Sequence, residues 1–172
     1  VVSKDTSGDS NGFILPLPEN GRYSFEVSRE GYMFKIDDVF SIESADINRH
    51  IEVVLEKINR GASISMKTVR FESGSAELSD GYQTDLTRLV LWLNSNSTSN
   101  VEIIGHTDNI GSNLSNKVLS TSRALSVMNF LLSNSISPER LSYSGVGSLV
   151  PIDSNDTAEG RAGNRRVEIV VK

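Results

Sequence analysis

The spacing of hydrophobic positions changes near residue 60 of this 172-residue chain. Before that point, apolar and aromatic residues alternate with polar ones in two stretches: Tyr23, Phe25 and Val27, then Ile51, Val53 and Leu55. A period of two predicts half-buried β-strands, and the pairs Asn20-Gly21 and Glu30-Gly31 predict turns. Residues 1–60 are therefore expected to form a small all-β segment.

Residues 61–172 show strand-like and helix-like segments in alternation. Strands are expected at 64–71, 101–106, 141–147 and 166–172, where apolar residues alternate or cluster. The last two are separated by a loop that contains Pro151, Asn155 and Gly160. With two helices between the first three strands, this order predicts an α+β fold, in which helices cover a mixed β-sheet of βαβαββ order.

Those two helices are predicted from apolar residues spaced three or four positions apart. The stripe of the first helix contains Tyr82, Leu86, Leu89, Val90 and Leu93. Ser79 or Asp80 is expected to cap its N-terminus, because a side-chain oxygen there can accept a hydrogen bond from a free backbone N–H. The second helix is expected over residues 113–134, with one apolar face made by Leu119, Val127, Phe130 and Leu131.

Arg123 interrupts the apolar face of the second helix. It stands four residues after Leu119 and four before Val127, so helical spacing places its guanidinium among buried residues. A buried cation needs an anion, and Asp108 is the nearest candidate, in the loop that follows a strand and precedes this helix. Two interpretations remain open: an internal Asp108–Arg123 salt bridge, or a site whose opposite charges bind a zwitterion such as an α-amino acid head group.

Composition excludes several classes of protein. The chain is 37% hydrophobic and 23% charged, which is ordinary for a globular protein. Its net charge of −5 argues against a broad nucleic-acid surface, and no stretch approaches the roughly 20 apolar residues of a membrane span. With no cysteine and only two histidines, His50 and His106, neither a zinc site nor any other cofactor is predicted.

A hydrolase would need a nucleophile with a neighbouring base, or a metal. His106 lies two residues from Asp108, but a histidine held by its backbone at the end of a strand explains it as well. Ser120 and Ser122 lie on a helix without a neighbouring base. No catalytic residue is therefore predicted, and Trp92 is expected in the core rather than as a platform for a sugar.

A series of motifs runs through residues 63–172 with continuous spacing: Gly105-His106-Thr107-Asp108, Gly111, Asn116, Leu119-Ser120, Arg123-Ala124, Val127, Gly145-Val146-Gly147, Pro151, Asn155, Glu159-Gly160-Arg161 and Asn164-Arg165-Arg166-Val167-Glu168. Together they resemble the OmpA-like peptidoglycan-binding domain, which is shared by OmpA proteins, Pal lipoproteins and MotB stator proteins. The resemblance implies non-covalent binding of the peptidoglycan stem peptide through its meso-diaminopimelate. It also implies a location in the periplasm, in association with the outer membrane.

The same resemblance assigns roles to individual residues. It implies that Asp108 holds the ammonium of the diaminopimelate and that Arg123 holds its carboxylate. The other residues that it places around the ligand are Thr107 and Asn116, the loop residues Phe71, Ser73, Gly74 and Ser75, and Arg165 and Arg166 at the rim. Two positions depart from the family pattern, since Glu72 stands where Asp is more usual and Ser115 where Tyr is frequent.

The first 60 residues resemble the later strands of carboxypeptidase regulatory-like sandwich domains. The resemblance rests on Phe13 to Leu17, Pro18, Gly21, Tyr23, Phe25 and Gly31-Tyr32. The expected domains are thus a partial sandwich at 1–60 and an OmpA-like domain at 61–172. This combination resembles envelope proteins of the Bacteroidetes type that anchor complexes, including secretion machinery, to the wall. A peptidoglycan hydrolase and a scaffold for other envelope proteins are the alternatives.

Overall fold

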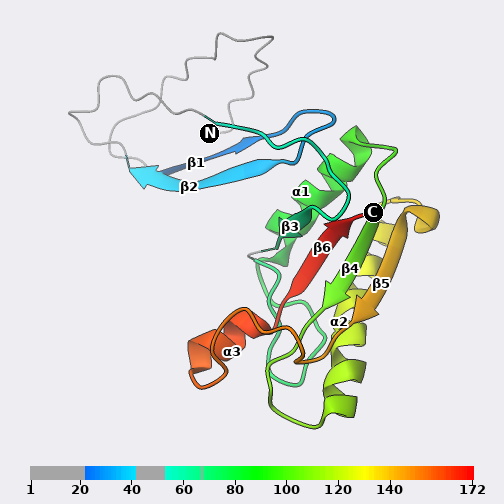
Figure 1. Ribbon diagram of the computed structural model, residues 1–172. Helices are drawn as coiled ribbons and strands as arrows, with labels where there is room; N and C mark the ends of the chain where they lie inside the picture. Colours follow the sequence, from blue (N-terminus) through cyan, green and yellow to red (C-terminus); the bar gives the residue numbers. More distant parts are fainter. Residues whose placement is uncertain (1–21, 42–52, 67) are drawn as a thin grey trace. The chain divides into compact units, whose positions relative to one another are not determined.

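The computed structural model describes residues 22–41, 53–66 and 68–172 (Figure 1). The stretch from Phe13 to Gly21 and Ile51, on which part of the N-terminal interpretation rests, lie outside the described residues. The chain divides into two compact units, one of residues 1–27 and 34–55 and the other of residues 28–33 and 56–172. None of the described helices has the length and apolar character that crossing a membrane requires.

The first unit contains two antiparallel strands, β1 (Arg22–Val27) and β2 (Lys35–Ser41). Their register shifts between Tyr23 and Phe25, which indicates a β-bulge. The alternating residues of β1 thus form a strand as predicted, whereas the strand predicted around Val53 and Leu55 is absent from residues 53–55. That these residues belong to a regulatory-like sandwich stays a prediction.

The second unit is built on a four-stranded mixed sheet of order β3-β6-β4-β5. The strands are β3 (Ser63–Ser65), β4 (Val101–Gly105), β5 (Leu141–Gly145) and β6 (Val167–Val171). β4 and β5 are parallel, and β6 is antiparallel to both β3 and β4. The predicted α+β fold with a helix-covered mixed sheet is confirmed.

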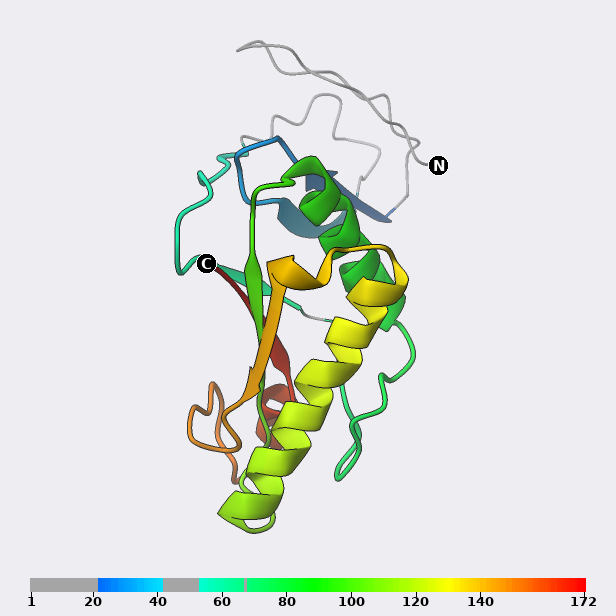
Figure 2. The same ribbon diagram turned by 90° about the vertical axis from the view of Figure 1, so that its right-hand side faces the viewer.

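Two long helices, α1 (Tyr82–Ser95) and α2 (Asn113–Ser133), lie on the same side of this sheet (Figure 2). Burial alternates along β4 and β6, so that every second side chain faces the helices. The core between helices and sheet consists mainly of Leu86, Leu89, Leu93, Val101, Ile103, Val127, Leu131 and Ile169. Trp92 is also buried, which confirms its predicted place in the core.

Three local predictions were wrong. The first strand ends at Ser65, and the buried residues Val69 and Phe71 belong to the loop that follows. Gly81, in the left-handed conformation with a φ of 93°, precedes α1 and gives no side-chain cap, while the Ser79 hydroxyl donates to the Arg70 carbonyl. A third helix, α3 (Ala158–Asn164), lies between β5 and β6, where a loop was expected. Its seven residues are too few to show an apolar stripe.

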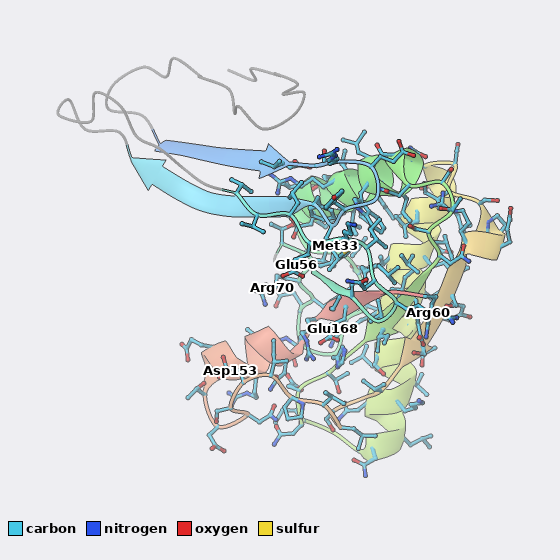
Figure 3. All side chains as sticks on the ribbon, turned by 45° about the horizontal axis from the view of Figure 1, so that its top comes forward. Met33, Glu56, Arg60, Arg70, Asp153 and Glu168 are labelled. Carbon is cyan, nitrogen blue, oxygen red and sulfur yellow. The ribbon has the colours of Figure 1, made fainter. Side chains whose placement is uncertain are left out.

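The turn at residues 28–33 belongs to the second unit. The Gly31 N–H donates to Asn96 Oδ1 at 2.8 Å, and Trp92 Nε1 donates to the Tyr32 carbonyl at 2.9 Å. The Met33 N–H donates to the Glu56 carbonyl at 2.8 Å, and these two residues lie side by side in Figure 3. Polar side chains in the last turn and at the C-cap of α1 thus hold a turn that lies 60 to 65 positions earlier in the chain.

Candidate functional site

Two glycines set the distance between α2 and the sheet. Gly105 and Gly145 are paired at the carboxyl ends of β4 and β5. A Cβ atom would lie 1.9 Å from the Ser120 carbonyl oxygen at Gly105 and 2.2 Å from the Thr121 nitrogen at Gly145. Only glycine permits this approach, and the close packing brings the next turn of α2, with Arg123, to the loops that follow the strands.

Arg123 is fully buried, at 0% exposure, and all its hydrogen bonds go to backbone carbonyls. Nε donates to Ser75 at 2.9 Å, Nη1 to His106 at 3.0 Å and Nη2 to Glu72 at 3.0 Å. The guanidinium also stacks 5.0 Å from the centre of the Phe71 ring. Burial lowers the pKa of Arg123 to about 10, so the group remains charged at neutral pH.

Asp108 is paired with Arg165 rather than with Arg123. Its Oδ2 lies 3.0 Å from Arg165 Nη1, and its Oδ1 accepts from the Ile110 N–H at 3.2 Å. Arg165 Nε donates in addition to the Phe71 carbonyl at 3.0 Å. The internal salt bridge between Asp108 and Arg123 that the sequence left open is therefore not formed, because carbonyls from two loops satisfy Arg123 instead.

Thr107 and Asn116 are buried beside this pair. The Thr107 N–H donates to the Gly147 carbonyl at 3.0 Å, while its hydroxyl has no hydrogen-bond partner among the described residues. Asn116 Nδ2 lies 3.4 Å from the Asp108 carbonyl, which ties the loop after β4 to the first turns of α2. Both residues thus lie next to Asp108 or its loop, and their contact with a ligand stays a prediction.

Two asparagines outside the predicted set support the site, Asn155 from the loop before α3 and Asn164 from the last position of α3. Asn155 Oδ1 accepts from the Asn109 N–H at 3.2 Å and from Asn164 Nδ2 at 3.0 Å. Asn164 is fully buried, and its Oδ1 accepts from the N–H groups of Ile152 and Asp153. Asp153 lies beside α3 in Figure 3. Both asparagines occur in the motifs of residues 63–172, and these motifs could have identified them from the sequence as residues near the site.

Other predicted residues lie away from the Asp108–Arg165 pair. The Arg166 guanidinium bonds to Glu168 Oε1 and to the Val150 carbonyl. Ser73 and Gly74 form the exposed tip of the loop after β3. Gly74 lines an open groove formed by that loop and α2, together with Ala76, Leu114, Ser115, Val118, Leu119 and Ser122. Of the predicted loop residues, Phe71 and Ser75 contact the arginines. Both do so through their carbonyls, and Phe71 also does so through its ring.

His106 is held by its backbone. Its N–H donates to the Arg166 carbonyl, and its own carbonyl accepts from Arg123. Burial and, to a smaller extent, repulsion from Arg166 lower the pKa of the ring to about 4, against the opposing attraction of Glu168, so it is neutral at pH 7. Among the described residues no three His, Asp or Glu side chains are grouped as metal ligands.

Comparison with known proteins places this site in a family. Residues 70–165, more than half of the chain, match the model of the OmpA family. The probable lipoprotein YiaD of Escherichia coli is 40% identical over 103 residues, which cover 60% of this chain and 47% of that protein. The peptidoglycan-binding protein ArfA of Mycobacterium tuberculosis is also 40% identical over 103 residues, 60% of this chain and 32% of its own.

A solved structure shows the same fold. The crystal structure of the peptidoglycan-associated lipoprotein from Burkholderia pseudomallei aligns with a TM-score of 0.58 and 26% identity, over 60% of this chain and 88% of that one. The chain spans less than half the length of the two curated relatives named above.

Proposed function

Because the chain belongs to the OmpA family, we propose that it binds peptidoglycan without cleaving it, through the meso-diaminopimelate of the stem peptide. One observation carries the proposal: a nearly buried carboxylate, Asp108, lies among guanidinium groups at the carboxyl ends of β4 and β5. The names of two relatives, the peptidoglycan-binding protein ArfA and the peptidoglycan-associated lipoprotein, point to the same polymer.

The chemistry of the site suits a zwitterion. The free amino-acid end of diaminopimelate carries an ammonium and a carboxylate on one carbon. We propose that Asp108 accepts the ammonium, since charge-assisted hydrogen bonds of this kind are the stronger ones. The guanidinium groups of Arg123 and Arg165 then supply the positive field for the carboxylate, and Thr107 and Asn116 hold the Asp108 loop in place.

In the cell, this binding would attach an envelope complex to the wall. The lipoprotein names among the relatives favour the periplasm, in association with the outer membrane. Other envelope proteins, including those of a secretion system, are proposed partners of the remaining parts of the protein.

The surroundings of Ser120 and His106 favour a binding module over a hydrolase. The Ser120 hydroxyl donates to the Lys117 carbonyl and accepts from the Gly147 N–H, so it joins α2 to the loop after β5. The His106 ring lies near Arg166 and Glu168, where its pKa is lowered to about 4. Neither group is arranged as a nucleophile with its base.

The test is co-sedimentation with purified diaminopimelate-type sacculi. The wild-type protein should be found in the pellet and should release no soluble muropeptides over time. Asp108→Asn should weaken binding roughly tenfold or more, because it removes the charge that the ammonium meets. Glu102→Gln is the matched control, since it makes the same change of charge on the sheet, where Glu102 bonds to Ser144 and Lys172.

Two results would count against the proposal. Wild-type protein that stays in the supernatant at modest salt would refute the binding, and muropeptide release that grows with time would refute the absence of catalysis.

A further inference from the structure

A second group of charged side chains lies on the face of the sheet opposite to α1 and α2. Burial alternates along β6, so Val167 and Ile169 face the helices and Glu168 faces the other way (Figure 3). An open cavity of about 180 Å³ lies beside Glu168, and its wall includes Ser63, Met66, Arg70, Ile152, Arg166 and Glu168. The three charged residues of the candidate site do not line this cavity, which is therefore a separate feature of the molecule.

Arg166 lines the cavity with a guanidinium that is buried but not fully satisfied. The residue is 6% exposed, and its Nε and Nη2 both donate to Glu168 Oε1, while Nη2 also donates to the Val150 carbonyl. Its Nη1 has no hydrogen-bond partner among the described residues. Leaving a buried donor unpaired costs free energy, and the cost is larger when the donor is charged. An acceptor bound in the cavity would supply the missing partner.

The cavity has more positive than negative charge. Arg70 is exposed, and its guanidinium makes one long hydrogen bond, 3.4 Å, to the Ala162 carbonyl. Among the described residues that line the cavity, Glu168 is the one carboxylate, against two guanidiniums. Burial is the main cause of the low pKa of the neighbouring His106 ring, and Arg166 lowers that pKa by more than Glu168 raises it. The pair thus keeps an excess of positive charge.

The lining also selects the kind of anion. A guanidinium can meet the two oxygens of a planar carboxylate with two parallel hydrogen bonds. Met66 and Ile152 add apolar walls, and the Ser63 hydroxyl adds a further donor. An inorganic anion would lose hydration against such walls, whereas an organic acid gains contact with them. The volume is that of about six water molecules in the liquid, which leaves room for a carboxylate and a short side chain.

We propose that this cavity is a second binding site, which takes a carboxylate carried on a short apolar group. Arg166 and Arg70 donate to the carboxylate, and the apolar group lies against Met66 and Ile152. Glu168 limits the affinity, because it competes with the ligand for Arg166. Such a carboxylate belongs either to a free organic acid or to the C-terminal residue of a peptide. The site goes beyond the proposed function and does not depend on it.

NMR titration of the isotope-labelled protein tests the proposal, with N-acetyl-L-alanine as the probe and N-acetyl-L-alaninamide as its uncharged match. The acid should shift the backbone N–H signals of Gly163, Val167 and Glu168, which line the cavity. The shifts should saturate with a Kd on the order of 1 mM, the strength expected of so small a ligand. The amide and inorganic phosphate should each bind about tenfold more weakly or less, since one lacks the charge and the other the apolar group.

The peptide acetyl-glycyl-glycyl-L-alanine distinguishes the two sources of the carboxylate. If it binds more tightly than N-acetyl-L-alanine, the site takes the end of a peptide. Equal affinity of the two probes assigns a free organic acid.

Glu168→Gln is the most informative variant, because it should strengthen binding. It removes the carboxylate that competes for Arg166, and we expect a gain in affinity of about threefold or more, which a misfolded protein would not show. Glu102→Gln makes the same change on the same face of the sheet and should leave the affinity unchanged.

Two arginine variants test the donors. Arg166→Gln should weaken binding of N-acetyl-L-alanine about tenfold or more, and Arg70→Gln, at an exposed position, about threefold. Arg60→Gln removes an exposed charge that does not line the cavity and should have no effect. Arg70→Gln should also sediment with sacculi as the wild type does, so that failure of this site and failure of the proposed function remain distinguishable.

Several results would overturn the proposal. Absence of a saturating shift up to about 20 mM acid, some twenty times the expected Kd, would mean that the cavity is not a binding site. Amide or phosphate binding as tight as that of the acid would show that it does not select an organic carboxylate. Weaker binding to Glu168→Gln, or wild-type affinity of both Arg166→Gln and Arg70→Gln, would place the probe elsewhere. Loss of sacculus binding in Arg70→Gln would contradict the independence of the two sites.

Discussion

The parallel strands β4 and β5 have an arginine at each end whose hydrogen bonds go only to backbone carbonyls. At the carboxyl ends this residue is Arg123. At the amino ends it is Arg140, the last residue of the 3₁₀ helix η1 (Pro138–Arg140), which directly precedes β5. Its hydrogen bonds, all 2.8–2.9 Å long, reach the carbonyls of Leu93, Asn96 and Ser99.

The difference between the two ends lies in what accompanies the arginine. Arg140 donates to carbonyls at the end of α1 and in the turn that follows it. Among the described residues the only carboxylate that acts on its pKa is the exposed Glu139 beside it. Arg123 shares its end of the sheet with the buried Asp108 and with Arg165. A partly or fully buried arginine alone is therefore compatible with a purely structural role, and the buried carboxylate with an accessible cation beside it is what distinguishes the proposed site.

The largest effect on stability is expected at the amino ends. Arg140→Ala removes the donors to three carbonyls and should lower the free energy of unfolding by about 3 kcal/mol. Affinity for a diaminopimelate-containing tripeptide should remain within twofold of the wild type, because the candidate site is at the other end of β4. Urea denaturation and titration calorimetry measure the two quantities.

Glu139→Ala is the control for this variant and should leave the denaturation midpoint unchanged, since that side chain is exposed. The contrast between the two ends would be wrong if Arg140→Ala lowered the affinity for the tripeptide without changing the denaturation midpoint. The two ends would then be coupled through the strands.

Arg123→Lys is expected to change both quantities. Lysine keeps the charge but offers one nitrogen, so it cannot serve carbonyls from two loops as the planar guanidinium does. We expect a loss of about 2 kcal/mol in unfolding free energy and roughly thirtyfold weaker tripeptide binding. Arg88→Lys on α1, where Arg88 lies 3.5 Å from Asp85, should change neither. If the Arg123→Lys variant bound the tripeptide with wild-type affinity, the role of Arg123 would be purely structural.

Much of this site could be predicted from residue spacing. The burial of Arg123 follows from its place in the stripe of α2, and the proximity of Asp108 follows from strand order. The partners of Arg123 could not be predicted, because backbone carbonyls exist at every position and leave no trace in side-chain identity. The Asp108–Arg165 pair joins residues 57 positions apart, and only the folded antiparallel pairing of β4 and β6 brings their loops together.

Errors in the predicted fold share a related cause. The start of α1 depends on the left-handed conformation of Gly81, which hydrophobic spacing does not report, and Ser79 found a competing acceptor at Arg70. The short α3 begins at a capping residue, Thr157, whose hydroxyl accepts from the Gly160 N–H at 3.0 Å. Helix caps and turns are decided by a few backbone angles, and periodicity over four or five residues cannot resolve them.

The smallest predicted effect is a pH dependence that a histidine gives to the carboxyl ends between pH 7 and pH 5.5. His106 lies at the carboxyl end of β4, and the chain's only other histidine is His50. Burial, aided by repulsion from Arg166, lowers the pKa of the folded-state ring to about 4, while an unfolded chain keeps it near 6.5. The unfolded state therefore takes up a proton first as the pH falls. The stabilising contribution is complete above pH 6.5 and is lost progressively between pH 6.5 and about 4.

His106→Gln removes this titration. The substitution can also change the unfolding free energy by an amount that does not depend on pH. This amount cancels when the unfolding free energy of each protein at one pH is subtracted from its value at the other. Between pH 7 and pH 5.5 the wild type should lose about 1 kcal/mol more unfolding free energy than the variant, measured by urea denaturation at each pH. Arg140→Ala, at the other end, should follow the wild-type pH profile with a uniform offset. Parallel profiles for wild type and His106→Gln would instead mean that the ring is protonated as easily in the folded protein as in the unfolded chain. The attraction of Glu168, 3.7 Å from Nε2, would then balance the effects of burial and Arg166 on the pKa.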